Sequence, residues 1–220
     1  MKGILFDFNG TLFNDTHLHK AAWHNFFLKN FGWDFSEEEI LRRCLGPSND
    51  DIFKDFFEGK LTKAEVDELA AKKEEEYRAS AKSDPANMHL IDGVPEMLDM
   101  LVEKGIPFAL ATASPIENIM FYLNDLGLKK WFTLDRIVYE EGKLPSKPNP
   151  AFYIEAARRI GLTPEECLIV EDSPTGIRAA INARAEGIIA IDRTAKREWL
   201  EEQKEIIAII HDFRGFKRFL

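Results

Sequence analysis

The sequence of 220 residues contains only two cysteines and no long apolar segment. No apolar stretch reaches the roughly 20 residues that a helix needs to cross a bilayer, and the start at Met1-Lys2 lacks the residue succession of a secretory signal. The protein is therefore expected to be soluble and cytoplasmic, with no membrane partner. Cys44 and Cys167 lie far apart and are expected to be small buried apolar residues rather than a disulfide or a metal pair.

The chain also has fewer basic than acidic residues. Its 29 Lys and Arg residues stand against 38 Asp and Glu residues, which gives a formal net charge of −9. No run of Lys and Arg interleaved with aromatic residues could follow a nucleic-acid backbone, so nucleic acid is not expected as a partner. The length allows one Rossmann-sized domain with an insertion, and a monomer is the default expectation.

Short apolar runs predict the buried strands of a parallel sheet, because they are too short for core helices and are mostly bounded by turn or cap residues. The expected strands are 4–8, 107–113, 168–171 and 188–191, with a further edge strand at 206–210. Helices that begin at capping residues are expected between them, at 94–104, 116–126, 149–160 and 177–185. This alternation predicts an α/β fold with a Rossmann-like, doubly wound parallel sheet and right-handed crossovers.

Residues 14–85 break the alternation of strands and helices. Four charged segments there have helical spacing and no convincing strand between them: 21–31, 37–45, 50–57 and 62–80. The sequence therefore predicts an all-helical cap at 14–85, inserted into a core formed by 1–13 and 86–220. Thr62 and Glu65 have the spacing of a capping box at the start of the longest cap helix. The acidic run 74–76 is expected to be a solvated helix face.

Four groups of polar residues stand at the ends of expected strands, where open parallel sheets bind ligands. They are Asp7, then Thr112-Ala113-Ser114, then Lys147, and finally Glu171-Asp172. A phosphoryl-transfer site needs a nucleophile, cations that neutralise the phosphoryl oxygens, and donors that hold them. Asp7 could attack phosphorus, the acidic pair offers oxygen ligands suited to Mg²⁺, and Lys147 and Thr112 could contact the phosphate. Their common order at strand ends indicates a phosphoryl-transfer site.

These groups give the chain a resemblance to a known superfamily over nearly its whole length. The motifs that carry it are Asp7-Phe8-Asn9-Gly10-Thr11-Leu12, Leu110-Ala111-Thr112-Ala113-Ser114, Ser146-Lys147-Pro148 and Val170-Glu171-Asp172-Ser173-Pro174-Thr175-Gly176-Ile177. The chain resembles the haloacid dehalogenase superfamily of phosphatases, in the subgroup with a helical cap that includes β-phosphoglucomutase-like enzymes.

The resemblance implies a role for each site residue. Asp7 would become the aspartyl-phosphate. The cofactor Mg²⁺ would be held by Asp7, the backbone carbonyl of Asn9, Glu171 and Asp172. The phosphoryl group would be bound by Thr112, the backbone amide of Ala113 and Lys147.

Asn9 departs from the pattern of this superfamily. Phosphatases and mutases of the superfamily have an aspartic acid there, which protonates the leaving oxygen and then activates water. A side-chain amide has no usable proton, and losing a general acid/base typically costs on the order of 10²–10⁴ in rate. Three explanations stay open: a slow or good-leaving-group phosphatase, for example on acyl or aryl phosphates, a substitute acid among Asp15, His17 and His19, or an engineered change that traps a complex.

Other members of the superfamily that lack the acid fit less well. Phosphonoacetaldehyde hydrolases need a cap lysine in the stretch corresponding to 45–49, which contains none. Haloacid dehalogenases do not need Mg²⁺, yet the acidic pair at 171–172 is intact.

A β-phosphoglucomutase normally has an arginine that clamps the distal phosphate where this chain has Asn49. His19, Trp23 and Lys73 resemble cap residues that contact substrate, although Trp23 is equally explained as a core anchor.

The sequence thus predicts a Mg²⁺-dependent, phosphatase-like hydrolase that acts on a small phosphorylated metabolite of about sugar-phosphate size and is slowed by Asn9. Two alternatives are a β-phosphoglucomutase-like phosphomutase and a non-catalytic phosphate-binding or regulatory protein. The identity of the substrate is left open, because cap loops determine it.

Overall fold

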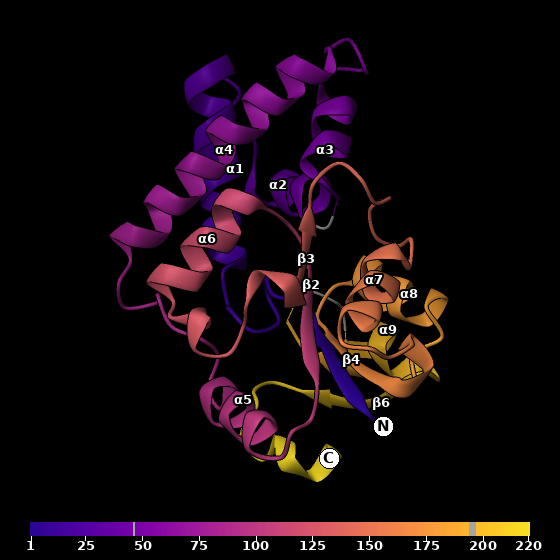
Figure 1. Cartoon of the computed structure of the whole chain (residues 1–220). Coiled ribbons are helices and arrows are strands. Elements are labelled where there is room, and N and C mark those ends of the chain that lie inside the picture. Colours follow the sequence, from indigo (N-terminus) through magenta and orange to yellow (C-terminus); the bar gives the residue numbers. More distant parts are fainter. Residues whose placement is uncertain (46, 194–196) are drawn as a thin grey trace. The chain divides into compact units, whose positions relative to one another are not determined.

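The computed structural model describes residues 1–45, 47–193 and 197–220. The chain divides into two compact units, one formed by Met1–Asn14 with His89–Leu220 and the other by Asp15–Met88. Figure 1 shows the sheet of the first unit and the helices of the second. None of the helices in the described residues is both long enough and apolar enough to cross a membrane.

The first unit is built on a six-stranded sheet in the order β3-β2-β1-β4-β5-β6, in which every neighbouring pair is parallel. The strands are β1 (Gly3–Phe6), β2 (Phe108–Pro115), β3 (Ile137–Glu140), β4 (Cys167–Glu171), β5 (Gly187–Ile191) and β6 (Ile206–Ile210). Phe6 pairs with Leu110 of β2 and with Val170 of β4. The residues that follow β1 therefore emerge beside the carboxyl ends of β2 and β4.

Helices cover both faces of this sheet, which confirms the predicted doubly wound α/β fold. They are α5 (Val94–Glu103), α6 (Ile116–Asp125), α7 (Ala151–Arg159), α8 (Pro174–Asn182) and α9 (Arg197–Glu202), with short 3-10 helices at Leu128–Lys130, Leu134–Arg136, Pro164–Glu166 and Phe216–Phe219. Helices α7 to α9 lie on the other side of β2 from α5 and α6 (Figure 1). The core beneath α7 to α9 includes Leu5, Ile169, Phe152, Ile177 and Leu200.

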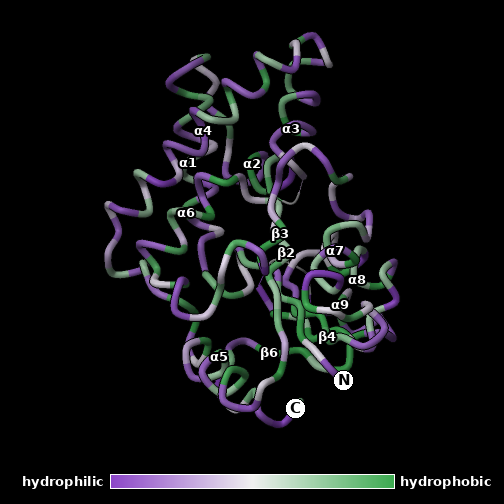
Figure 2. Tube along the Cα trace, in the orientation of Figure 1, coloured by the Kyte–Doolittle hydropathy of each residue, from purple (hydrophilic) through white to green (hydrophobic). Residues whose placement is uncertain are grey.

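Among its described residues, the second unit has four helices: α1 (Thr16–Phe31), α2 (Glu37–Cys44), α3 (Asn49–Phe56) and α4 (Lys63–Ser83). Its core is mainly aromatic and includes Trp23, Phe26, Phe27 and Phe53. The capping box at Thr62 and Glu65 is present at the start of α4, as predicted. In Figure 2 these helices alternate between hydrophobic and hydrophilic residues, whereas the central strands of the sheet are mostly hydrophobic.

Some elements differ from the sequence-based expectation. Strand β3 was not expected, because only its first two residues, Ile137 and Val138, are buried. Helix α1 begins at Thr16 rather than at residue 21, although its first turn has a polar sequence. Strand β1 ends at Phe6 rather than at residue 8. Cys44 and Cys167 are both buried and free.

Candidate active site

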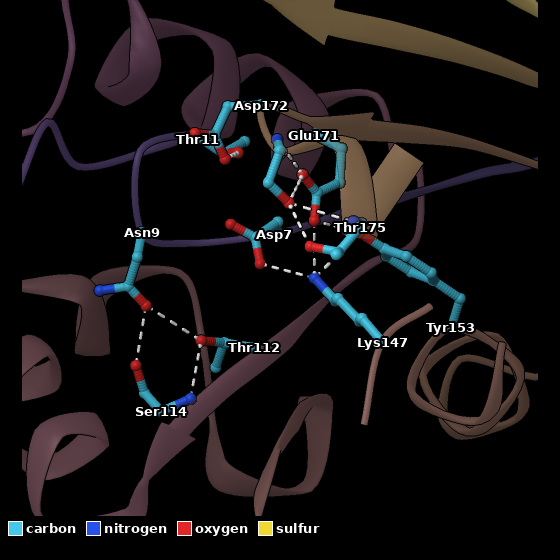
Figure 3. A network of polar contacts seen from close by, with 12 residues as sticks. Asp7, Asn9, Thr11, Thr112, Ser114, Lys147, Tyr153, Glu171, Asp172 and Thr175 are labelled. Atoms are coloured by element: carbon cyan, nitrogen blue, oxygen red, sulfur yellow. Dashed lines mark hydrogen bonds and ion pairs between the residues drawn. The ribbon is translucent and has the colours of Figure 1, made fainter. Parts of the chain in front are cut away.

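The sequence-predicted site residues of the first unit meet at the carboxyl ends of its central strands (Figure 3). Asp7 comes directly after β1, Thr112 lies in β2, and Glu171 and Asp172 lie at the end of β4 and just beyond it. Lys147 comes from the segment between β3 and α7. Because the strands are parallel, their carboxyl ends share one edge of the sheet and place these side chains together.

A cluster of three buried carboxylates forms the centre of this site. Asp7, Glu171 and Asp172 each place one carboxylate oxygen within 4.8 Å of the oxygens of the other two. The Nζ of Lys147 donates hydrogen bonds to Oδ1 of Asp7 at 2.7 Å and to Oε1 of Glu171 at 2.8 Å. The site therefore brings three acidic groups and one cation into a space with little access to solvent.

Burial and neighbouring charges set the proton affinities in this cluster. Burial raises the pKa of Asp7 to about 7, with Lys147 opposing the rise and Glu171 adding to it. Burial alone would lower the pKa of the Lys147 ammonium, but Asp7 and Glu171 raise it well above its usual value. Lys147 is therefore a permanent cation at neutral pH, suited to holding an anionic ligand.

The acidic pair is held in place by neighbouring hydroxyl and amide groups. Oε2 of Glu171 accepts hydrogen bonds from the backbone N–H of Ser173 at 2.7 Å and from its hydroxyl at 3.1 Å. The hydroxyl of Tyr153 donates to Oε1 of Glu171 at 3.2 Å. The hydroxyl of Thr11 donates to Oδ1 of Asp172 at 3.2 Å. These contacts restrict both carboxylates to one orientation.

Two glycines make the space that this acidic pair occupies. A Cβ added at Gly176 would lie 1.5 Å from Oε1 of Glu171, and one added at Gly10 would lie 2.3 Å from Oδ2 of Asp172. Gly10 also has a φ of +75°, which other residues rarely adopt. Sequence reasoning placed both glycines inside the motifs without assigning them a role. Sequence reasoning also missed Tyr153. Its position in a helix gives no sign that its hydroxyl contacts Glu171 at the end of β4.

Asn9 is held by three hydroxyl groups. Its Oδ1 accepts hydrogen bonds from the hydroxyls of Ser114 at 2.8 Å and Thr112 at 3.2 Å, and its Nδ2 donates to the Tyr122 hydroxyl at 2.9 Å. Ala113 lies between Thr112 and Ser114 and is exposed. Sequence reasoning missed Tyr122, because its position in α6 carries no signal of a contact with residue 9.

The predicted cap residues all belong to the helical unit, where several of them contact one another. The Nζ of Lys73 donates to Nδ1 of His19 at 3.0 Å and to Oε1 of Glu74 at 2.8 Å. Nδ2 of Asn49 donates to the same Oε1 at 2.9 Å. Trp23 is 1% exposed within the aromatic core, as expected of a core anchor, and the Lys73 Nζ lies 4.8 Å from its ring centroid. Residue 46, in the cap segment 45–49, lies outside the described residues.

The three candidate substitute acids have partners inside the helical unit. The hydroxyl of Tyr77 donates to Oδ2 of buried Asp15 at 2.5 Å. Nε2 of His19 lies 3.4 Å from the same oxygen, and the His19 ring stacks on Tyr77 with 4.0 Å between centroids. Nε2 of His17 lies 3.6 Å from Oδ2 of Asp84. Each of the three therefore has a contact within the helical unit, and a role as the substitute acid stays a prediction.

Glu74 corrects one expectation from the sequence. The acidic run 74–76 was expected to be solvated, but Glu74 is buried, while Glu75 is exposed and Glu76 is half-buried. Burial would raise the pKa of Glu74, but the charges of Lys73 and His19 and the hydrogen bonds from Lys73 and Asn49 lower it to about 2. Glu74 is therefore an ionised partner of a buried lysine.

Replacing Glu74 with glutamine should destabilise the protein by about 3–5 kcal/mol, because it leaves the Lys73 ammonium buried without its counter-ion. The folded pKa of about 2 lies below the usual 4.5, so the stabilisation is complete above about pH 4.5 and is lost as the pH falls towards 2. Thermal unfolding midpoints at pH 6 and pH 3 measure both effects. The matched control is Glu75→Gln on the same helix, and an equal loss in both variants would contradict the assignment.

Comparison with known proteins identifies a family and several relatives that the chain resembles over most of its length. A profile of the family described as haloacid dehalogenase-like hydrolase matches residues 4–190. The validoxylamine A 7'-phosphate phosphatase of Streptomyces hygroscopicus subsp. limoneus is 28% identical over 197 residues, which cover 90% of this chain and 87% of that protein. Hexitol phosphatase A of Escherichia coli (strain K12) is 28% identical over 203 residues, which cover 91% of this chain and 88% of that protein.

A solved structure extends this similarity to the fold. The crystal structure of a HAD hydrolase, family IA, variant 3, from Entamoeba histolytica HM-1:IMSS has a TM-score of 0.88 and is 30% identical in sequence. The superposition covers 98% of this chain and 95% of that chain. Both units of the present chain therefore fall within the region that the two proteins share.

Proposed function

This chain belongs to the haloacid dehalogenase-like hydrolases, and we propose that it acts as a Mg²⁺-dependent phosphatase on a small phosphorylated metabolite of about sugar-phosphate size. The observation that carries the proposal is the convergence of Asp7, Lys147, Glu171 and Asp172 at one edge of the sheet. The names of two Escherichia coli relatives support it, since one is a hexitol phosphatase and the other a fructose-1-phosphate phosphatase.

The acidic cluster fits a divalent cation. Three buried carboxylates share this space with the ammonium group of Lys147, and a divalent cation would add positive charge there. Uncompensated buried charge is costly, and carboxylate oxygens are the ligands that Mg²⁺ prefers. Asp7, Glu171, Asp172 and the backbone carbonyl of Asn9 would hold the ion. When bound, Mg²⁺ would neutralise charge on the phosphoryl oxygens.

The side chains around this cluster have the chemistry for a two-step phosphoryl transfer. A carboxylate oxygen of Asp7 attacks phosphorus, and the bond from phosphorus to the leaving oxygen breaks. Lys147, the Thr112 hydroxyl and the Ala113 N–H hold the other phosphoryl oxygens during this step. Water then attacks the aspartyl-phosphate and releases inorganic phosphate, which restores Asp7.

Asn9 determines which leaving groups the first step accepts. The amide can donate a hydrogen bond to the leaving oxygen but cannot transfer a proton to it, whereas an alkoxide needs that proton. The proposed enzyme therefore works slowly on alkyl phosphates and better on aryl or acyl phosphates, whose leaving groups depart without one. A phosphomutase is disfavoured, because Asn49 bonds to the ionised Glu74 rather than offering a cationic site for a second phosphate.

A panel of sugar, nucleotide, aryl and acyl phosphates, assayed with and without Mg²⁺, tests this function. Reactions quenched in acid should also yield a peptide phosphorylated at Asp7 by mass spectrometry. Phosphate release that depends on Mg²⁺, together with the phosphorylated peptide, is the expected result. Phosphate binding with neither release nor the phosphorylated peptide would instead identify a non-catalytic binding or regulatory protein.

A further inference from the structure

The three hydroxyls around Asn9 come from two different elements of the first unit. Thr112 and Ser114 lie in β2, and Tyr122 lies in α6, which follows directly. Figure 3 shows Thr112 and Ser114 on the oxygen side of the Asn9 amide. The Tyr122 hydroxyl contacts the amide nitrogen at 2.9 Å and lies 3.4 Å from the Ser114 hydroxyl. Both ends of the amide are therefore engaged.

Tyr122 is well placed to restrict the movement of this amide. Its side chain is 1% exposed, and its ring packs on Phe8 with 4.2 Å between centroids and on Phe13 with 6.4 Å. Phe8 immediately precedes Asn9, so the ring and the hydroxyl of one residue contact two successive residues of the loop. A buried aromatic ring has few rotamers available, which gives its hydroxyl a defined position.

The hydrogen-bond directions in this group are consistent with one orientation of the amide. The Thr112 hydroxyl accepts the backbone N–H of Ser114 at 3.2 Å, so its single hydrogen is available for Oδ1 of Asn9. An amide oxygen only accepts hydrogen bonds and an amide nitrogen only donates them. In the structure Oδ1 accepts from the Thr112 and Ser114 hydroxyls, and Nδ2 donates one of its two hydrogens to the Tyr122 hydroxyl.

We propose that Tyr122 is a positioning residue for the side chain at position 9. Its hydroxyl holds Nδ2 of Asn9 in one orientation, from which the amide can donate a hydrogen bond to the leaving oxygen of a phosphate ester. This role rests on the proposed phosphatase function, because only there does residue 9 meet a leaving group. Tyr122 itself acts through Asn9 and needs no contact with the substrate.

Removing only the Tyr122 hydroxyl should reduce turnover without much effect on binding. A displacement of about 1 Å in a catalytic group costs up to about 10²-fold in rate. Tyr122→Phe should therefore lower kcat about tenfold and change KM less than about twofold. The matched control is Tyr139→Phe. Tyr139 is a half-buried residue of β3, and its hydroxyl hydrogen-bonds to the side chain of Glu141, just after the strand. That control should leave both constants unchanged.

A double-mutant cycle separates positioning from a general structural effect. In an Asn9→Ala background there is no amide to hold, so Tyr122→Phe should have no further effect on kcat. An equal loss of kcat in the two backgrounds would show that the hydroxyl matters for the fold rather than for residue 9, and would overturn the proposal. Thermal unfolding of each variant confirms that the comparison is made between folded proteins.

A second measurement tests the positioning without any activity. The side-chain NH₂ signals of Asn9, assigned by their loss in Asn9→Ala, should shift and exchange faster with solvent in Tyr122→Phe but not in Tyr139→Phe. Unchanged signals in Tyr122→Phe would overturn the proposal. If the signals change but the protein hydrolyses no phosphate ester of the panel, the hydrogen bond from Asn9 to Tyr122 is supported and the phosphatase function is rejected.

Discussion

Changing Asn9 to aspartate should raise kcat for an alkyl phosphate at least about tenfold, because the new side chain can protonate the leaving oxygen and then activate water. The three hydroxyl groups around position 9 suit this change. Those of Ser114 and Thr112 already donate to Oδ1, and the Tyr122 hydroxyl can turn from accepting the amide hydrogen to donating to a carboxylate. The acid should therefore occupy the place of the amide with little rearrangement.

The leaving group provides the internal control for this experiment. An aryl phosphate needs no proton on its leaving oxygen, so the first step, measured as the burst of phenol release, should gain much less from Asn9→Asp than the first step with an alkyl phosphate. The water step is common to both substrates and should gain in both. Asn124→Asp, an exposed position in α6, should change neither rate. If the alkyl phosphate shows no gain, either another residue already serves as the acid or the natural substrate is not an ester.

Replacing Asp7 with asparagine should lower kcat for every substrate by about 10⁴-fold or more, a loss of the size seen when a catalytic nucleophile is removed. The amide matches the size of the carboxylate but cannot form the bond to phosphorus. It also removes one of the two carboxylates to which Lys147 donates hydrogen bonds. Steady-state phosphate release and mass spectrometry of the active-site peptide measure the two consequences, lost turnover and lost phosphorylation.

Asp135→Asn, at an exposed position in a short 3-10 helix, serves as the matched control and should retain full activity. Residual turnover in Asp7→Asn of more than about one part in 10² would place the nucleophile elsewhere. Thermal unfolding should show that the variant folds, since the change reduces the number of buried charges in the site. Asp7→Asn therefore tests the nucleophile, and Asn9→Asp tests the general acid/base.

Most of the sheet was predictable from local sequence. Four of the expected strands and the edge strand at Ile206–Ile210 occur in the structure, because each is an apolar run of a length that suits a strand. Strand β3 could not be predicted in the same way. It is four residues long, and its last two, Tyr139 and Glu140, are only half-buried at the edge of the sheet. Pairing with β2, rather than its own composition, makes it a strand.

The helical unit shows the same limit at single residues. Residues 74–76 are all glutamate, yet only Glu74 is buried. Helical periodicity could indicate which residues share a face, but not that the ammonium group of Lys73 is buried beside Glu74. Burying Lys73 without a counter-ion would be costly, which explains why Glu74 is buried with it.

The amino-acid sequence alone determined the order of strands and helices and the positions of the polar motifs, because both depend on spacing along the chain. It therefore located Asp7, Lys147, Glu171 and Asp172 at one edge of the sheet. Only the tertiary structure decided which side chains orient them, such as Tyr153 beside Glu171 and Tyr122 beside Asn9. Tyr122 and Asn9 are 113 residues apart in the chain, and hydrogen bonds between such distant residues depend on how the helices pack, which local sequence patterns do not record.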